Sequence, residues 1–310
     1  VGTSGYIPYA LIRMQNYHCP FHDSDGLCLI QKHMGDSALS TTCASYPRNY
    51  NAVDGVLERS LNLSCPEAAR LILLSDTPLQ FVVQEAEITL PHDQLDSLDT
   101  DTALAEKPFR HFQPIRAIVL ATLQNRTYPV WQRVLLLNLF CHQLGLIRPA
   151  EYDERIPRLL EDFNDHVQNG TLRDSMAQAQ AMPELQLQAM KLLIDHRLQL
   201  GLVGDSFRQF VGQFRQALGY AADDSSKDIA LSYQTAYTEY YRPFMERHEA
   251  LLENYLVNYV FKTLFPFGPQ QGRLLESRSI YEEFCLLVIH FSLIKTLLIG
   301  LAGTYRDSFT

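Results

Sequence analysis

Apolar residues recur at helical spacing along most of this chain. From about residue 105 onward they lie three or four positions apart with polar residues between them, which is the pattern of helices with one buried face. The pattern predicts helices over residues 114–124, 129–146, 150–168, 183–199, 205–219, 227–265 and 278–302. Pro243 should break or kink the longest of these, and Pro266 and Gly268 should end it.

Residues up to about 77 show a shorter-range pattern with many turns. Asp54-Gly55 separates an apolar run over 50–53 from another over 56–63, which predicts a β-hairpin. Ser64-Cys65-Pro66-Glu67 has the spacing of a capping box. A helix should therefore begin there, with Cys65 at its N-terminus, and extend to Leu74.

A less regular stretch connects these two parts. Pro78 should end the preceding helix, residues 81–90 are predicted to form a strand, and residues 93–101 are acidic and polar. The expected fold is mainly α. It consists of a small cysteine-bearing module with a β-hairpin over 1–77, a linker over 78–104 and a large α-helical domain over 105–310.

Composition and charge narrow the classes of protein. The 310 residues are 46% hydrophobic and 20% charged, which is typical of a globular protein. A formal net charge of -9 argues against a nucleic-acid partner and suits a cationic one. Residues 284–303 approach the length of a membrane span, but His290 and Lys295 would be costly in lipid, so a core helix and no membrane are expected. No signal-peptide pattern is present.

Four of the six cysteines lie within the first 65 residues, at Cys19, Cys28, Cys43 and Cys65. Their spacing matches neither a zinc ribbon nor a ferredoxin. Each lies in a turn or at the end of an element, and a helix N-terminus favours the thiolate, which is the form that binds metal. Four thiolates suffice for an iron–sulfur cluster or a tetrahedral zinc site. The alternative is four buried free cysteines; His18 and His22 are further candidate ligands.

The four cysteines belong to longer motifs. These are Cys19-Pro20-Phe21, Asp25-Gly26-Leu27-Cys28, Thr42-Cys43 followed by Tyr46-Pro47-Arg48, and Ser60-Leu61-Asn62-Leu63-Ser64-Cys65-Pro66-Glu67-Ala68-Ala69-Arg70. Together they resemble the signature of the flagellin lysine N-methylase family. Near the other end the chain is similar to that family at Asn254-Tyr255-Leu256-Val257-Asn258-Tyr259, Leu264-Phe265-Pro266-Phe267 and Ser279-Ile280-Tyr281.

The resemblance implies a bacterial cytoplasmic enzyme that transfers methyl groups from S-adenosylmethionine to lysine amines of flagellin. It implies a [4Fe-4S] cluster on Cys19, Cys28, Cys43 and Cys65, with zinc as the alternative, and places the donor and substrate sites in the helical domain. Family members carry an earlier C-x-x-C-C run, and this chain has none before Cys19. Which thiolates bind the cluster therefore stays open.

Tyrosines suggest a substrate surface. Aromatic faces attract ammonium groups at about 0.5–2 kcal/mol per contact, which suits a lysine substrate. The lysine must also lose its proton, which calls for a tyrosinate, a carboxylate such as Glu239 or Glu246, or a desolvating pocket. The alternative is ordinary packing of half-buried rings. At spacings i, i+4, i+7 and i+8, the tyrosines expected on one helix face are Tyr233, Tyr237, Tyr240 and Tyr241.

Two arginines lie inside the cysteine motifs. Arg48 and Arg70 are predicted to stabilise a negatively charged cluster or to hold a cofactor carboxylate, with a structural salt bridge as the alternative. No glycine-rich Rossmann loop is present, so the sequence does not locate the methyl-donor pocket. The expected function is that of a protein-lysine N-methyltransferase. The alternative is a non-enzymatic, metal-stapled protein-interaction module.

Overall fold

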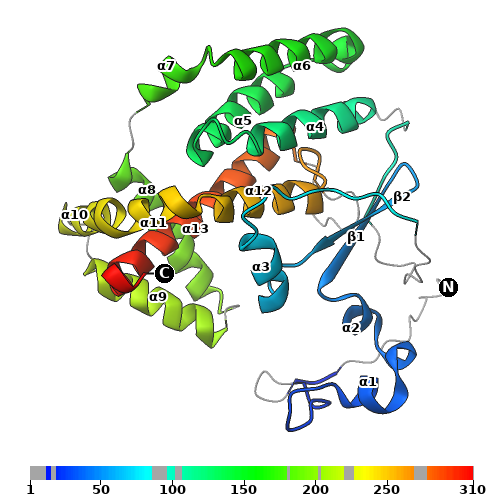
Figure 1. Cartoon of the computed structure of the whole chain (residues 1–310), viewed down its shortest axis with the longest axis vertical. Coiled ribbons are helices and arrows are strands. Elements are labelled where there is room, and N and C mark those ends of the chain that lie inside the picture. Colours follow the sequence, from blue (N-terminus) through cyan, green and yellow to red (C-terminus); the bar gives the residue numbers. More distant parts are fainter. Residues whose placement is uncertain are drawn as a thin grey trace, which may run out of the picture.

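The computed structural model describes residues 12–14, 19–85, 96–101, 107–179, 182–201, 204–219, 227–268 and 278–309. It confirms the mainly α prediction: helices make up most of the molecule, and a small sheet lies at one side (Figure 1). The N-terminal part contains α1 (Leu29–Met34), η1 (Asp36–Ala38), α2 (Thr41–Ser45), β1 (Arg48–Val53), β2 (Val56–Leu61) and α3 (Pro66–Leu73).

The predicted hairpin is confirmed. β1 and β2 pair antiparallel, with Val53 opposite Val56. Asp54 and Gly55 between them have φ angles of 50° and 78°. Two positive φ angles in a two-residue loop give the turn whose twist matches that of the flanking strands.

The sheet contains a third strand that the sequence pattern did not predict. β3 (Asp96–Leu98) runs parallel to β1, so that the order is β2-β1-β3. The strand predicted over 81–90 is wrong for residues 81–85, which are irregular, and its remainder lies outside the described residues. A three-residue strand is too short for apolar alternation to show, and its partner is distant in sequence.

The predicted helices are confirmed with small shifts at their ends. The structure adds the short α7, which the pattern missed. The elements are η3 (Phe109–His111), α4 (Phe112–Leu123), α5 (Val130–Gly145), η4 (Pro149–Glu151), α6 (Tyr152–Asn169), α7 (Arg173–Ala177), α8 (Pro183–Gln199), α9 (Asp205–Leu218), α10 (Lys227–Thr235), η5 (Ala236–Tyr241), α11 (Arg242–His248), α12 (Ala250–Lys262), α13 (Ile280–Tyr305) and η6 (Arg306–Ser308).

Two local predictions need correction. The long helix over 227–265 is interrupted before Pro243 by η5, a π-helical turn, and again at Glu249 between α11 and α12. The capping box expected at Ser64 does not form. Cys65 is the N-cap of α3 without a side-chain bond, and the Glu67 carboxylate accepts from Arg70 instead.

α13 is the central helix of the body. Within the described residues it is the helix that is long and apolar enough to cross a membrane by length and composition. It packs against α5, α8, α9, α10, η5 and α12, as a core helix would. Ser279 and Glu282 form a capping box at its N-terminus. The packing contacts cover part of the helix: 39% of its most apolar 18-residue stretch is buried.

The sheet is docked on the helical body by polar contacts. Arg116 of α4 forms a bidentate pair with Glu58 of β2 at 2.6 and 2.7 Å. Asn51 of β1 donates to the Lys262 carbonyl at 3.0 Å, and Asn258 of α12 donates to the Leu61 carbonyl at 3.2 Å. These contacts hold the hairpin against α4 and α12, while the division at residues 77 and 104 stays a prediction.

Candidate functional site

Two hollows lie on opposite sides of α11. The smaller, which we call the tyrosine cavity, has a volume of about 190 Å³. It lies between the start of α5, the turn η5, α11 and α13. Its lining residues are Pro129, Val130, Trp131, Tyr237, Tyr241, Arg242, Met245, Glu246, Glu249, Leu252, Phe291 and Lys295.

The π-helical turn determines which tyrosines reach this cavity. The rings of Tyr237 and Tyr241 stack with centroids 5.8 Å apart, and both line it. Tyr233 is buried in the core with its hydroxyl 3.5 Å from Thr296 Oγ1, and Tyr240 packs against the core without lining the cavity. A π-helical turn contains more residues than an α-helical turn, so the four tyrosines no longer lie on the single helix face that α-helical spacing predicts. The structure brings together two of the four predicted tyrosines.

A lysine lies against these rings. Lys295 of α13 places its Nζ 5.6 Å from the centroid of the Tyr237 ring, within range of a cation–π contact. Burial lowers the pKa of Lys295. Burial also raises the pKa of Tyr233 to about 12 and raises the pKa of Tyr241. These two hydroxyls therefore keep their protons at neutral pH, which argues against either as a tyrosinate base.

Two carboxylates reach the cavity. Glu246 is exposed and lies 3.8 Å from Arg242 of the same helix. Glu249 accepts from the backbone nitrogen of Val130 at 2.7 Å and from Arg133 at 3.3 Å. Glu239, a candidate from the sequence, does not line the cavity. Of the two carboxylates, Glu246 thus makes fewer hydrogen bonds and ion pairs with other residues of the protein.

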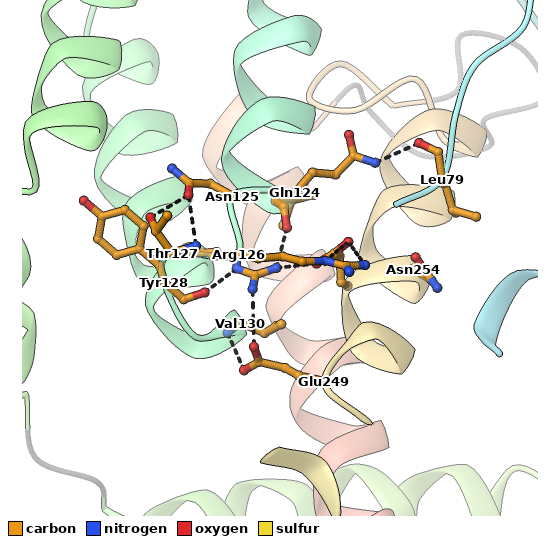
Figure 2. A network of polar contacts seen from close by, with 12 residues as sticks. Leu79, Gln124, Asn125, Arg126, Thr127, Tyr128, Val130, Glu249 and Asn254 are labelled. Carbon is orange, nitrogen blue, oxygen red and sulfur yellow. Dashed lines mark hydrogen bonds and ion pairs between the residues drawn. The ribbon is translucent and has the colours of Figure 1, made fainter. Parts of the chain in front are cut away.

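A buried polar network connects the two hollows (Figure 2). Arg133, with 1% of its surface exposed, donates to Glu253 at 2.7 Å and to the carbonyls of Tyr128 and Leu123. Glu253 also accepts from Arg126, whose Nη1 donates to the Asp76 carbonyl at 2.9 Å. With Glu249 at one end and Asp76 at the other, the network fixes one wall of each hollow.

The larger hollow, which we call the Phe244 cleft, has a volume of about 570 Å³. It lies between the C-terminal end of α3, the α11–α12 junction and the end of the chain. Its lining residues are Leu73, Leu74, Asp76, Phe244, Arg247, His248, Ala250, Leu251 and Phe309.

All four predicted cysteine ligands are free thiols within the described residues. Cys28 begins α1 and forms a β-bridge with His22, close in sequence to Cys19. Cys43 lies in α2 and Cys65 begins α3; a hydroxyl contact of 3.4 Å between Ser64 and Tyr46 connects their segments. In Figure 1, α1 is set apart from α3.

The described geometry does not fit a shared metal. No three His, Cys, Asp or Glu side chains of the described residues lie close enough together to hold one ion, these four cysteines included. The metal assignment to the four cysteines stays a prediction.

The two predicted arginines differ. Arg70 forms a bidentate, exposed pair with Glu67 of its own helix, which is the structural salt bridge considered as its alternative. Arg48 begins β1 and is exposed. Neither lines the tyrosine cavity or the Phe244 cleft.

Lys295, Glu249 and Glu253 were not predicted from the sequence as site residues. Lys295 and Glu253 each stand alone as a charge in an apolar helical run, and such residues are almost never fully buried unless they are paired. That signal could have marked both. Glu249 carries no comparable signal, because its neighbours in sequence are polar.

Comparison with known proteins identifies the family. Residues 116–310 match the model of the FliB lysine N-methylase C-terminal domain. Over 56 residues, 18% of this chain, the identity is 45% to a Salmonella muenchen protein named flagellar biosynthetic protein FliU and to lysine-N-methylases of Salmonella typhimurium and Salmonella choleraesuis. The matched stretch spans 33% of the first relative and 14% of each of the others. No solved structure matches the chain. With well over half of its length matched by that family model, the chain belongs to the FliB lysine N-methylase family.

Proposed function

We propose that the protein is an S-adenosylmethionine-dependent protein-lysine N-methyltransferase that acts on flagellin in the bacterial cytoplasm. The family and the names of its relatives support lysine methylation, and one relative's name refers to flagellar biosynthesis. We infer that the tyrosine cavity receives the acceptor lysine. Its volume of about 190 Å³ suits a side chain rather than a nucleoside.

The observation that carries the proposal is that Lys295, whose pKa burial lowers, lies in the wall of this cavity. A lysine amine attacks a methyl group only when neutral, so the acceptor must lose its proton near neutral pH. Burial already lowers the pKa of Lys295, which lies in the cavity wall. An acceptor amine that enters the same cavity also loses contact with water, which lowers its pKa. A neighbouring cation lowers that pKa further, because it disfavours the charged ammonium form.

The remaining residues orient the acceptor and take its proton. Tyr237, Tyr241 and Trp131 present aromatic surface to the lysine stem and its ammonium group. The exposed carboxylate of Glu246 accepts the proton, since the buried hydroxyl of Tyr241 keeps its own. The donor supplies an electrophilic methyl group: the carbon–sulfur bond breaks as the nitrogen–carbon bond forms, and the sulfur keeps the electron pair.

The test is transfer of labelled methyl groups from S-adenosylmethionine to purified flagellin by the full-length protein. Glu246→Gln should lower kcat by at least about 100-fold, the lower end of what general bases contribute. The loss should shrink as pH rises, because the acceptor then loses its proton to water. Glu154→Gln, an exposed change on α6, is the matched control and should leave kcat unchanged. No label on lysine with the unaltered protein would remove the methyltransferase proposal.

The predicted cluster needs its own experiment. Anaerobic purification followed by iron and sulfide analysis should give brown protein with about four irons per chain if the four cysteines hold a [4Fe-4S] centre. One zinc per chain without lysine methylation would favour the metal-stapled interaction module. Cys65→Ser, compared with Cys141→Ser in the helical core, separates a metal ligand from a buried thiol.

A further inference from the structure

We propose that the Phe244 cleft binds the adenosyl end and the amino-acid tail of the methyl donor. The assignment rests on the proposed function, because methyl transfer is what calls for such a ligand. The cleft has a volume of about 570 Å³, within the range of about 300–1,000 Å³ typical of small-molecule sites. The tyrosine cavity, about a third as large, cannot also hold a nucleoside.

One wall of the cleft is aromatic. The ring of Phe244 packs against Phe309 with centroids 4.8 Å apart at 66°, and against His248 with centroids 4.4 Å apart at 31°. Leu73, Leu74 and Leu251 surround this group with apolar surface. Purine rings stack on such surfaces without needing base-specific hydrogen bonds, so the wall fits an adenine.

Two charged groups in the cleft match the rest of the donor. The described residues give the Asp76 carboxylate no hydrogen bond or ion pair, so it can accept from the hydroxyls of a ribose. Arg247 donates its Nε to the Pro243 carbonyl at 3.2 Å, and no carboxylate of the described residues pairs with it. Its remaining donors suit the carboxylate of an amino-acid tail.

Hydrogen bonds from three side chains hold the loop that carries Asp76 in place. Asn254 donates to the Ser75 carbonyl at 2.8 Å, and Arg126 donates to the Asp76 carbonyl at 2.9 Å. Gln124 donates to the Leu79 carbonyl at 2.8 Å (Figure 2). Three side chains therefore fix the backbone of one short loop. A site whose backbone is fixed before binding loses less free energy in ordering itself around a ligand.

Opposite faces of α11 line the two hollows: Arg242, Met245 and Glu246 line the tyrosine cavity, and Phe244, Arg247 and His248 line the cleft. One short helix thus contributes to both binding sites.

The experiment measures binding of S-adenosylhomocysteine and of adenosine to the full chain by calorimetry, without methyl transfer. Phe244→Ala and Asp76→Asn should each weaken both ligands by about ten-fold or more. Arg247→Gln should weaken S-adenosylhomocysteine by about ten-fold and leave adenosine unchanged, because adenosine has no carboxylate. Asp174→Asn on α7 is the matched control and should change neither.

Two different outcomes distinguish a failure of the donor-site assignment from a failure of the proposed function. If the unaltered protein binds S-adenosylhomocysteine and methylates flagellin, and the Phe244, Asp76 and Arg247 variants bind as tightly as it does, the cleft is not the donor site and the methyltransferase proposal stands. If the unaltered protein neither binds the probe nor transfers a methyl group, both fail. A thermal melt of each variant shows whether a loss of binding reflects loss of the fold.

Discussion

Arg133 and Glu253 are charged residues that almost no water reaches. Each has 1% of its surface exposed, and they are joined at 2.7 Å. Loss of the Glu253 charge leaves the buried Arg133 with only its longer ion pair to Glu249 at 3.3 Å, so Glu253→Gln should lower the free energy of unfolding by about 3–5 kcal/mol. Urea denaturation measures this. Glu154→Gln, which breaks an exposed pair with Arg158, should change it by less than about 0.5 kcal/mol.

The buried tyrosines should show in an alkaline titration. Burial raises the pKa of Tyr233 to about 12, while exposed tyrosines titrate near their usual value of about 10. Between these pH values the unfolded chain has lost the proton that the folded chain still binds, so stability should fall as pH rises from about 10 to 12. Absorbance of the tyrosinate at high pH, with Tyr233→Phe for comparison, assigns the step. A Tyr233 step near pH 10 would contradict its burial.

The sequence indicated candidate residue types better than their arrangement. Of the predicted tyrosines, Tyr237 and Tyr241 line the tyrosine cavity, and their role in substrate binding stays a prediction. The sequence had no means of showing that Lys295 lies against Tyr237. The two residues belong to different helices, and pairing between distant elements is not encoded in local spacing. The same reason explains why Asp76 and Phe309 were not associated before the fold was known.

The crossing of α9 and α13 depends on a glycine. A Cβ atom at Gly300 would collide with the ring of Phe214, which is itself buried. Gly300→Ala should therefore lower the free energy of unfolding by about 1–3 kcal/mol, the usual cost of overpacking. Gly212→Ala on α9 is the matched control, because nothing lies within 4 Å of its Cβ position. That change should stabilise the helix by up to about 1 kcal/mol. Chemical denaturation of both variants gives the comparison.

Long helices were predictable as elements, and their irregularities were not. Apolar periodicity gave α4, α5, α6, α8 and α9 because each has a buried face along its length. The turn η5 was missed, since a local change from α to π hydrogen bonding leaves composition unchanged. β3 was missed because its three residues gain stability only from pairing with β1.

The docked sheet should unfold together with the helical body. The sheet contributes only Val53 and Leu98 to the main apolar core, and it is joined to α4 and α12 by the Glu58–Arg116 pair and two asparagine bonds. Scanning calorimetry should give one transition whose calorimetric and van't Hoff enthalpies agree. Glu58→Gln should lower its midpoint, and Glu67→Gln on the exposed face of α3 should not. Two resolved transitions would show that the sheet is a separate unit.

At the scale of the whole molecule, the sequence predicted a helical body with a small cysteine-bearing part and a hairpin, and the structure has these features. It could not predict whether the four thiols meet. Convergence of Cys19, Cys28, Cys43 and Cys65 depends on how α1 is placed relative to α3, which turn residues do not determine. The substrate and donor sites were expected in the helical domain, which stays a prediction; the two hollows that we propose for them are lined largely by residues of that part of the chain.

Because of the π-helical turn η5, the lining of the tyrosine cavity is sensitive to the deletion of a single residue. Each residue of an α-helix advances the chain by about 100° around the axis. Deletion of Thr238, an ordinary single-codon event, would convert the turn to α geometry and rotate α10 relative to α11 by about that angle. Tyr237 would then leave the cavity while Tyr241 stayed. A chain that lost this one residue would keep the other side chains of the cavity and lose one of its two stacked tyrosine rings.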